Sequence, residues 1–432
     1  MRILLVKPKW FVHGGVYRFL EEIKFTPLHI AILAALSEGH EVRLCDNDWE
    51  EIPYDESFDL IGITTATFTS RRAYEIAHRW REKGAKVVLG GVHASLLPQE
   101  CLEHADAVVV GEAEYIWQDV LRDAEQGLLG GVYQQERLTD MNDVPLPRRD
   151  LFREDYWVAT VQTSRGCPNR CRFCYLPSVP WHEHRQRDVE LVYEELEALP
   201  QNVVFFVDDN MFADEAYVMR LCERIEPLRK IWSVQVPTNV ARNEPLLAAM
   251  ARAGCFHVQV GFQTVNPGSL EDAGIAQNRV EEYAEVVRAF HRHRILVLGF
   301  FMFGFDRDDS SIFRSTEQVI RRIDLDDVCL YILTPYPGTA MYEELEREGR
   351  LISSDRLDYG WANAVFEPAL MSPGELEQGV QGIYESLHRH FRATAWRKLL
   401  KRLPILWRHP HILGIMTRAL FRRIDIARKP AG

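Results

Sequence analysis

The sequence lacks several features that would each place it in a broad class of proteins. None of its apolar runs reaches the roughly 18 residues that a membrane-spanning helix needs. We expect no signal peptide, because the apolar residues after Met1 run straight into Lys7-Pro8-Lys9. Basic residues are too few for a general nucleic-acid binder, since 51 Lys and Arg stand against 63 Asp and Glu and give a net charge of −12. We therefore expect a cytoplasmic protein of about two or three domains.

Cysteine is also scarce, with 8 residues in 432, and its distribution is uneven. Five of these cysteines lie singly in apolar surroundings, as small buried residues do: Cys45, Cys101, Cys222, Cys255 and Cys329. The other three are Cys167, Cys171 and Cys174, which share one short segment with spacings of x3 and x2. Because Gly166 and Pro168 break any regular helix there, we expect a loop that wraps an ion or a cluster.

Three thiolates on one loop leave a coordination position open. Thiolate is a preferred ligand of iron–sulfur clusters, zinc and Cu(I), and a fourth thiolate would close a structural site. An iron with a free position can bind a substrate or a cofactor. The alternative is a zinc site that takes its fourth ligand from elsewhere, and His182 or His184 lies near enough in the sequence to supply it.

The segment from Ser164 to Tyr175 resembles the CxxxCxxC signature of radical S-adenosylmethionine (SAM) enzymes, in which an aromatic residue follows the third cysteine. The resemblance implies that Cys167, Cys171 and Cys174 hold a [4Fe–4S] cluster whose fourth iron binds SAM. It further implies that one electron cleaves SAM to a 5′-deoxyadenosyl radical, which abstracts a hydrogen atom from the substrate. Tyr175 would then lie at the adenine.

Short apolar strands alternate with helices over residues 1 to about 130. The expected strands are Arg2–Val6, Glu41–Cys45, Leu60–Thr64, Lys86–Leu89 and Ala107–Val110, and the expected helices are Leu28–Leu36 and a segment near Ser70–Glu82. This alternation predicts an α/β fold with a doubly wound parallel sheet. Ligands of such sheets bind at the carboxyl ends of the strands, where Gly90, Gly91, Gly111 and Glu112 stand.

These segments resemble the cobalamin-binding domain that precedes the barrel in one large class of radical SAM enzymes. The matching residues are Pro27-Leu28, Gly39-His40-Glu41-Val42, Ile61-Gly62-Ile63-Thr64, Gly90-Gly91 with His93 and Pro98, and Gly111-Glu112 with Glu114. The sequence lacks the DxHxxG motif that supplies an axial histidine to cobalamin in mutases.

Two interpretations of this first domain stay open. In one it binds cobalamin, and the candidate binding residues are Gly90, Gly91, His93, Gly111 and Glu112. In the other it is a flavodoxin-like domain that kept its fold and lost its cofactor. His93 is then either a ligand or a hydrogen-bonded residue of the turn.

Proline density marks a linker before a second domain. Six further strands are expected at Trp157–Thr163, Val203–Val207, Ser233–Val236, Val258–Phe262, Leu296–Phe303 and Val328–Thr334. With the helices between them, these strands predict a partial (β/α)6 barrel whose active site lies at the strand ends. The predicted domains are 1–135 (cobalamin-binding-like), 136–155 (linker), 156–345 (radical SAM barrel) and 346–432 (helical C-terminal extension).

The same resemblance implies roles for residues at the ends of the barrel strands. Asp209 and Asn210 follow the second barrel strand, where the superfamily binds the amino group of SAM, and a carboxylate complements an ammonium ion. The alternative is that an Asp at a strand end caps the next helix. Gln263 stands where the class commonly has Glu, so it can bond ribose hydroxyls but cannot act as a base. The remaining candidates for SAM or substrate contacts are Gln235, Thr334 and Pro335.

The composition becomes basic from His388 onward, where Asp425 is the only acidic residue. Trp396 and Trp407 contribute to an apolar side of the same segment. Basic amphipathic helices that carry Trp lie on anionic membranes. Peripheral membrane contact is therefore one expectation, and packing on the acidic remainder of the chain is the other.

Together the two resemblances predict a radical SAM enzyme of small-molecule biosynthesis, with an external electron donor of the flavodoxin or ferredoxin type. The favoured reaction is a cobalamin-dependent methylation, in which methylcobalamin donates a methyl group to a substrate radical. The alternative is a cobalamin-independent dehydration, deoxygenation or epimerisation of a sugar-like, aminoglycoside-type substrate, with an empty first domain. The implied cofactors are a [4Fe–4S] cluster and SAM, joined by cobalamin in the first case. We assign no catalytic residue and no substrate, because fold does not determine function.

Overall fold

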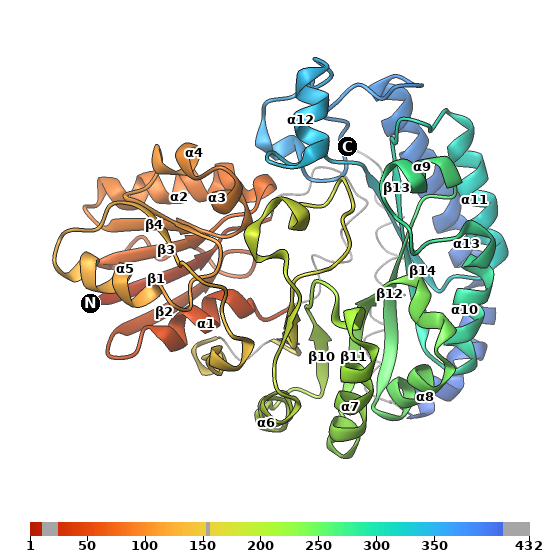
Figure 1. Cartoon of the computed structure of the whole chain (residues 1–432), viewed down its shortest axis with the longest axis horizontal. Helices are drawn as coiled ribbons and strands as arrows, with labels where there is room; N and C mark the ends of the chain where they lie inside the picture. Colours follow the sequence, from red (N-terminus) through yellow and green to blue (C-terminus); the bar gives the residue numbers. More distant parts are fainter. Residues whose placement is uncertain (11–24, 153–155, 409–432) are drawn as a thin grey trace.

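The computed structural model describes residues 1–10, 25–152 and 156–408, and of Pro180 and residues 392–408 it describes the backbone. Two six-stranded sheets dominate it, and every strand pair in both is parallel. Figure 1 shows the N-terminal sheet, coloured red to orange, beside a larger curved sheet in green to blue. This arrangement confirms the expected doubly wound sheet followed by a partial barrel.

The first sheet has the strand order β2-β1-β3-β4-β5-β6. Its strands are β1 (Arg2–Lys7), β2 (Glu41–Asp46), β3 (Leu60–Thr64), β4 (Lys86–Gly90), β5 (Ala107–Val110) and β6 (Gly131–Gln134). The chain leaves β1 for β2 and then returns past β1 to β3, so the strand order reverses at β1. A reversal of this kind opens a ligand crevice at the carboxyl ends of the strands.

Helices cover both faces of the first sheet, which is why its central strands are continuous apolar runs. They are α1 (Leu28–Leu36), α2 (Ser70–Glu82), α3 (Val92–Leu96), α4 (Pro98–Leu102) and α5 (Trp117–Glu125). Trp80 of α2 packs on one face and Trp117 of α5 on the other, both fully buried. The sequence missed β6, because this edge strand is mostly exposed and carries no apolar pattern.

The second sheet has the order β14-β13-β12-β11-β10-β7, with β7 and β14 as its edges, so it forms an open, partial barrel. Its strands are β7 (Val158–Val161), β10 (Val203–Phe206), β11 (Ile231–Val236), β12 (Cys255–Gln263), β13 (Leu296–Phe303) and β14 (Asp327–Ile332). A short antiparallel hairpin joins β8 (Ser164–Arg165) to β9 (Arg185–Gln186).

Outer helices cover the convex face of the barrel sheet (Figure 1). They are α6 (Val189–Ala198), α7 (Glu215–Ile225), α8 (Glu244–Arg252), α9 (Pro267–Asp272), α10 (Tyr283–Arg292), α11 (Ser311–Ile323) and α13 (Pro373–Arg408), and α12 (Ala340–Arg347) precedes the last of these. The ring of Phe262 lies 5.5 Å from that of Phe301 and 4.7 Å from that of Tyr283. Burying one such side chain stabilises the fold by about 1.5–3 kcal/mol, so this core holds the strand ends in place.

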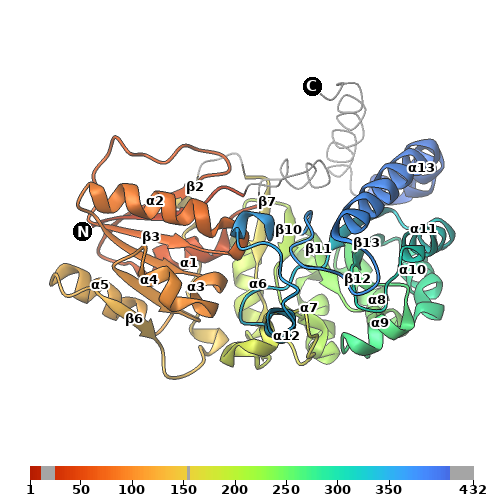
Figure 2. The same cartoon turned by 90° about the horizontal axis from the view of Figure 1, so that it is seen from above.

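The first half of α13 belongs to the barrel core, and Leu376, Ile383 and Leu387 are buried in it. Figure 2 shows α13 beside α11. Most of the basic segment after His388 lies outside the residues whose side chains the structure describes, so the expected membrane contact stays a prediction. Within the described chain, no helix combines the length and the apolar character needed to span a membrane.

Candidate functional site

The three cysteines lie on a loop that begins at the β8–β9 hairpin. The loop turns at Gly166, which has a φ of +84° and whose missing Cβ would collide with the carbonyl oxygen of Glu183. Only glycine accepts both conditions. The amide of Cys167 donates to the carbonyl of His182 at 3.0 Å, and that of Cys174 donates to the carbonyl of Cys171 at 3.0 Å. The hairpin and these turns therefore make the loop that the sequence predicted.

The thiols of this loop are half-buried and close enough to affect one another. Burial raises the pKa of Cys171 to about 11 and that of Cys174 to about 12, and the neighbouring cysteines add to both shifts. In the described part of the chain, His, Cys, Asp and Glu side chains nowhere gather in a group of three able to hold a metal ion. Three thiolates ionise together only beside a strong positive charge, which a bound metal centre supplies. Cys167, Cys171 and Cys174 do not form such a group in this structure, so their role as cluster ligands stays a prediction.

Asp208, directly after β10, anchors this loop. Its Oδ1 accepts hydrogen bonds from the amide and hydroxyl of Thr163, at 3.0 and 2.8 Å, and from the amide and hydroxyl of Ser164, the latter at 2.7 Å. Burial raises the pKa of Asp208 to about 6, against the lowering effect of these hydrogen bonds. Asp208 is therefore a structural residue that ties β10 to the start of the cysteine loop.

The next two residues face the cysteine loop instead. Asp209 accepts a hydrogen bond from the amide of Gly166 at 2.8 Å and lines a cavity. Asn210 donates to the sulfur of Cys167 at 3.6 Å, and among the described residues its buried Oδ1 has no hydrogen-bond partner. A carboxylate and an unpartnered amide oxygen beside the cysteines are acceptors of the kind that an ammonium group requires.

Four further predicted residues lie at the carboxyl ends of other barrel strands. Gln263 has a φ of +68° at a register shift of β12, and its side chain folds back over Gly261. Gln235 is exposed on β11 and lies 3.4 Å from Gln259. The hydroxyl of Thr334 donates to the carbonyl of Ile332 at 3.1 Å, so Thr334 and the adjoining Pro335 present backbone rather than a free hydroxyl.

A cavity of about 1380 Å³, part of it open to solvent, joins the two sheets. From the first sheet come the predicted Gly90, Gly91, Gly111 and Glu112. From the other side come Arg165, Tyr175, Leu176, Trp181, Val207 and Asp209. In Figure 1 the yellow segment that carries the cysteines lies between the two sheets. A ligand in this cavity would contact both the first domain and the cysteine loop.

Ion pairs hold the two walls of this cavity together. Glu112 receives hydrogen bonds from Arg185 at 2.7 and 2.9 Å and lies 3.3 Å from Arg165, which pairs with Glu114 at 2.6 Å. Burial opposes ionisation of Glu112, but Arg185 and Arg165 outweigh it and lower the pKa to about 2. Glu112 was predicted as a cofactor-binding residue, but in the structure its carboxylate forms ion pairs with Arg185 and Arg165. Arg165 and Glu114 were not predicted as site residues.

His93 does not line the cavity, contrary to its prediction as a cofactor-binding residue. Its ring is fully buried. One ring nitrogen lies 3.2 Å from the hydroxyl of Thr67, and the other lies 3.0 Å from that of Tyr74 and 3.1 Å from Glu100. Because both nitrogens already have partners, His93 is the hydrogen-bonded turn residue that the sequence left as an alternative.

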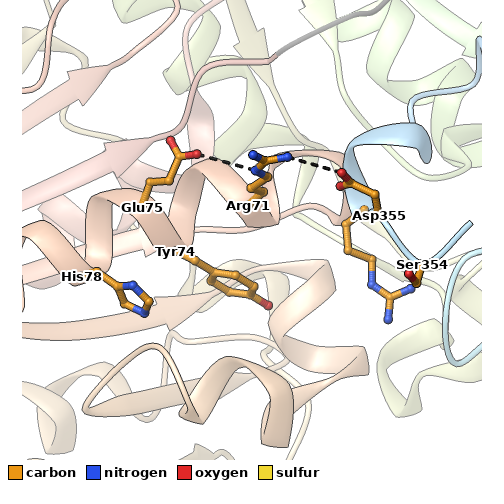
Figure 3. Close-up of a pocket in the computed structure, with 7 residues that line it drawn as sticks. Arg71, Tyr74, Glu75, His78, Ser354 and Asp355 are labelled. Carbon is orange, nitrogen blue, oxygen red and sulfur yellow. Dashed lines mark hydrogen bonds and ion pairs between the residues drawn. The ribbon is translucent and has the colours of Figure 1, made fainter.

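A second, open pocket of about 670 Å³ lies where α2 meets the short helix η11 (Arg356–Asp358). Figure 3 shows Arg71 between Glu75, at 3.8 Å, and Asp355, at 3.3 Å. Such exposed pairs contribute little to stability. This pocket marks another contact between the first domain and the segment after the barrel.

His29 is a cavity residue that the sequence analysis missed. It lies in the first turn of α1 and is exposed. Desolvation by the surrounding protein lowers the pKa of its imidazole, and Lys7 adds to the effect. A lone polar residue within the apolar sequence of α1 was the available signal.

Two protein-family models match the chain. The model of the radical SAM superfamily matches residues 161–319, and that of the B12 binding domain matches residues 24–121. The chain belongs to the radical SAM superfamily, in the class whose radical SAM domain follows a cobalamin-binding domain, and it is an enzyme of the radical SAM type. The expected cofactors are thereby confirmed at the level of domains: a [4Fe–4S] cluster and SAM for one, and cobalamin for the other.

Several curated relatives span most of the chain. Bacteriochlorophyllide d C-12(1)-methyltransferase of Chlorobaculum tepidum is 28% identical over 88% of this chain and 86% of its own. Hopanoid C-2 methylase of Rhodopseudomonas palustris is 24% identical, over 82% and 72% respectively. The anaerobic magnesium-protoporphyrin IX monomethyl ester cyclase of Rubrivivax gelatinosus is 24% identical, over 89% and 77%.

Two solved structures share the fold. The radical SAM methyltransferase TsrM of Kitasatospora setae, with cobalamin and a [4Fe–4S] cluster bound, matches with a TM-score of 0.67 and 18% identity over 89% of this chain and 88% of its own. The cobalamin-dependent radical SAM enzyme OxsB matches with a TM-score of 0.63 and 15% identity, over 88% and 66%. At these identities the likeness establishes the fold alone.

Proposed function

We propose that this enzyme is a cobalamin-dependent methyltransferase that attaches a methyl group to a carbon atom of a biosynthetic intermediate. The observation that carries the proposal is the cavity shared by the strand ends of the first sheet and the cysteine loop. A methyl donor in the first domain and a radical source in the second would meet there. The names of relatives such as the bacteriochlorophyllide methyltransferase and the hopanoid methylase point to the same reaction class.

Each cofactor has candidate residues in the structure. Cys167, Cys171 and Cys174 would ligate the cluster. Tyr175, Asp209, Asn210, Gln235, Gln263, Thr334 and Pro335 would contact SAM. Gly90, Gly91 and Gly111 would border the cobalamin, since a Cβ at Gly90 would have its nearest neighbour 3.8 Å away and thus extend into the cavity space.

In the proposed reaction the cluster supplies the electron that cleaves SAM, and cobalamin supplies the transferred methyl group. The protein's own part is to position and to shield. The carboxylate of Asp209 would hold the ammonium group of SAM, and Asn210 would add its unpartnered Oδ1. Arg165 and Arg185 fix the cysteine loop against the first domain, and Trp181 covers Gly111 at the cavity wall.

We further propose that the substrate carries a large, mostly apolar ring system. Aromatic rings run from the inner face of the barrel to the first domain: Phe300 to Tyr331 at 5.5 Å, Tyr331 to Trp361 at 5.6 Å, and Trp361 to Phe68 at 5.2 Å and Trp10 at 5.3 Å. Trp361 holds a φ of +68°, a strained conformation that persists where the surroundings impose it. Flat aromatic surface favours stacking with apolar rings.

Anaerobic turnover with SAM and a one-electron reductant tests the reaction type. A bacteriochlorophyllide is the first substrate to try, with a hopanoid as the second. Methylation would yield 5′-deoxyadenosine and S-adenosylhomocysteine in similar amounts, and only when cobalamin is present. Formation of 5′-deoxyadenosine alone, with or without cobalamin, would instead support the dehydration or epimerisation that the comparisons do not favour.

A further inference from the structure

His29 is the only polar residue of helix α1. Helix α1 reads Leu-His-Ile-Ala-Ile-Leu-Ala-Ala-Leu, and Ile30, Ala31 and Ala34 are buried against the first sheet. His29 lines the cavity between the sheets, as do its apolar neighbours Leu28, Ile30 and Ile32. A polar side chain that an apolar helix turns toward a cavity points to a ligand there rather than to core packing.

The place of His29 in the fold brings it to the ligand-binding edge of the sheet. A helix that follows a parallel strand begins at the carboxyl edge of the sheet, so the first turn of α1 lies beside the ends of the strands. Thr64, Gly90 and Gly111, at or directly after the ends of β3, β4 and β5, line the same cavity as His29. Arg165 and Asp209 line it from the barrel side.

The chemistry of the ring suits a metal ligand. Because its pKa is lowered, the imidazole of His29 is neutral at pH 7 and keeps a lone pair for coordination. None of the described residues forms a hydrogen bond with this ring. Imidazole is a common ligand of first-row transition metals, including cobalt.

The other described histidines of the first domain already have hydrogen-bond or ring partners. His93 has partners on both nitrogens. His78 and His104 lie 2.9 Å apart, and the ring of His104 stacks on Tyr74 at 3.8 Å. His40 lies 3.3 Å from the N-terminal amine. Of these histidines, only His29 lines the cavity.

We propose that His29 is an axial ligand of the cobalt of cobalamin, supplied by the first turn of α1 in place of the absent DxHxxG histidine. The proposal rests on the proposed function in one respect, namely that cobalamin binds in the cavity between the sheets. It adds a metal–protein bond that neither the family match nor the sequence motif assigns.

Electron paramagnetic resonance of the cob(II)alamin-loaded full chain tests this bond. An axial nitrogen splits the cobalt signal, and ¹⁴N gives triplets whereas ¹⁵N gives doublets. The protein is therefore produced with ¹⁵N-histidine and loaded with unlabelled cobalamin, so that a protein ligand and the cofactor's own benzimidazole give different patterns. Loading with cobinamide, which lacks the benzimidazole, provides a second sample.

The expected result is doublets in both labelled samples. His29→Ala should retain the cluster absorbance and lose the doublets, and added ¹⁴N-imidazole should restore a nitrogen splitting as triplets. His104→Ala is the matched control and should keep the doublets. Should His29→Ala fold poorly, His29→Gln provides a second variant of similar polarity and should also lose the doublets.

Several outcomes would overturn the proposal. Triplets in the labelled cobalamin sample would identify the benzimidazole as the ligand, and a signal without nitrogen splitting would show that no nitrogen binds cobalt. Doublets that persist in His29→Ala would assign the bond to another histidine. In these three cases cobalamin binding, and with it the proposed function, would stand. Failure of the wild type to bind cobalamin would remove both.

Discussion

At the scale of single residues, the neighbouring residues Asp208 and Asp209, which follow β10, have different roles. Asp208 points its carboxylate into the protein, where two residues of the cysteine segment donate to it. Asp209 points toward the cysteine loop and the cavity. Both residues follow the end of β10 at Phe206, so the backbone of the loop sets their different directions.

The cluster ligands give the first prediction. Cys171→Ala should abolish iron–sulfur binding and turnover, because two thiolates do not hold the cluster that three ligate. Anaerobic reconstitution followed by iron analysis and visible absorbance measures this. Cys329→Ser is the control and should retain the cluster and turnover, since Cys329 lies in β14 rather than on the cysteine loop. One tightly bound zinc and no iron in the wild type would contradict the assignment.

Asp208 gives a prediction about pH. Its pKa is raised from 3.8 to about 6 in the folded protein, so the folded state binds the proton more tightly than the unfolded state. The corresponding stability is present below about pH 4 and is lost as pH rises toward about 6. Asp208→Asn does not titrate, so wild type should lose on the order of 3 kcal/mol relative to the variant over this range. Urea unfolding of the cluster-free proteins measures the difference, and parallel profiles would refute the expectation.

At the scale of elements, the β8–β9 hairpin couples the cysteine loop to the first sheet. The coupling consists of buried ion pairs from Arg165 and Arg185 to Glu112 and Glu114. A buried pair costs much to break from one side, because the remaining charge is left without its partner. The hairpin therefore holds the cysteine loop against the first sheet.

Glu112→Leu should destabilise the protein by roughly 3 kcal/mol, since it leaves Arg185 without its carboxylate. Combining it with Arg185→Met should recover much of that loss, because no unpaired charge then remains. Urea unfolding measures both variants. Breaking the exposed pair of Arg288 and Glu285 by Arg288→Met is the matched control and should leave the midpoint nearly unchanged. A double variant no more stable than Glu112→Leu would argue against a bridge.

At the scale of the whole molecule, neither domain encloses the cavity alone. The first sheet contributes the glycine-rich strand ends, and the barrel side contributes the cysteine loop with Tyr175 and Asp209. The cavity exists because the two domains pack together. Changes that narrow it from the first-domain side should therefore affect cobalamin without affecting the cluster.

Gly90→Val tests this separation. A Cβ at Gly90 has its nearest neighbour 3.8 Å away, so the larger side chain fits the fold but extends into the cavity. We expect cobalamin affinity to fall at least about tenfold, a loss of about 1.4 kcal/mol, with iron content unchanged. Equilibrium titration monitored by absorbance measures it. Gly382→Ala, in α13 with open space around its Cβ, is the control. Unaltered affinity in Gly90→Val would place the corrin elsewhere.

The sequence by itself determined the elements and the cluster motif of this protein. Helices α1 and α2 have the expected bounds, because apolar periodicity and the following glycines act locally. The spacing of Cys167, Cys171 and Cys174 likewise needs no tertiary information, since all three candidate ligands lie on one loop. The sequence did not predict the exposed strand β6, because this strand pairs with β5 at the edge of the sheet and has no apolar pattern.

Only the tertiary structure decided which predicted residues reach the cavity. His93 and Glu112 lie in similar glycine-rich loops, yet packing of α2 and α4 buries the first, and approach of the hairpin engages the second. His29 lies in an apolar helix, and it becomes a cavity residue only when α1 docks on the first sheet and the barrel closes over it. Local sequence determines the direction in which a side chain points from its own helix or strand. The residues that it then contacts belong to segments distant in the chain, so only the tertiary structure determines them.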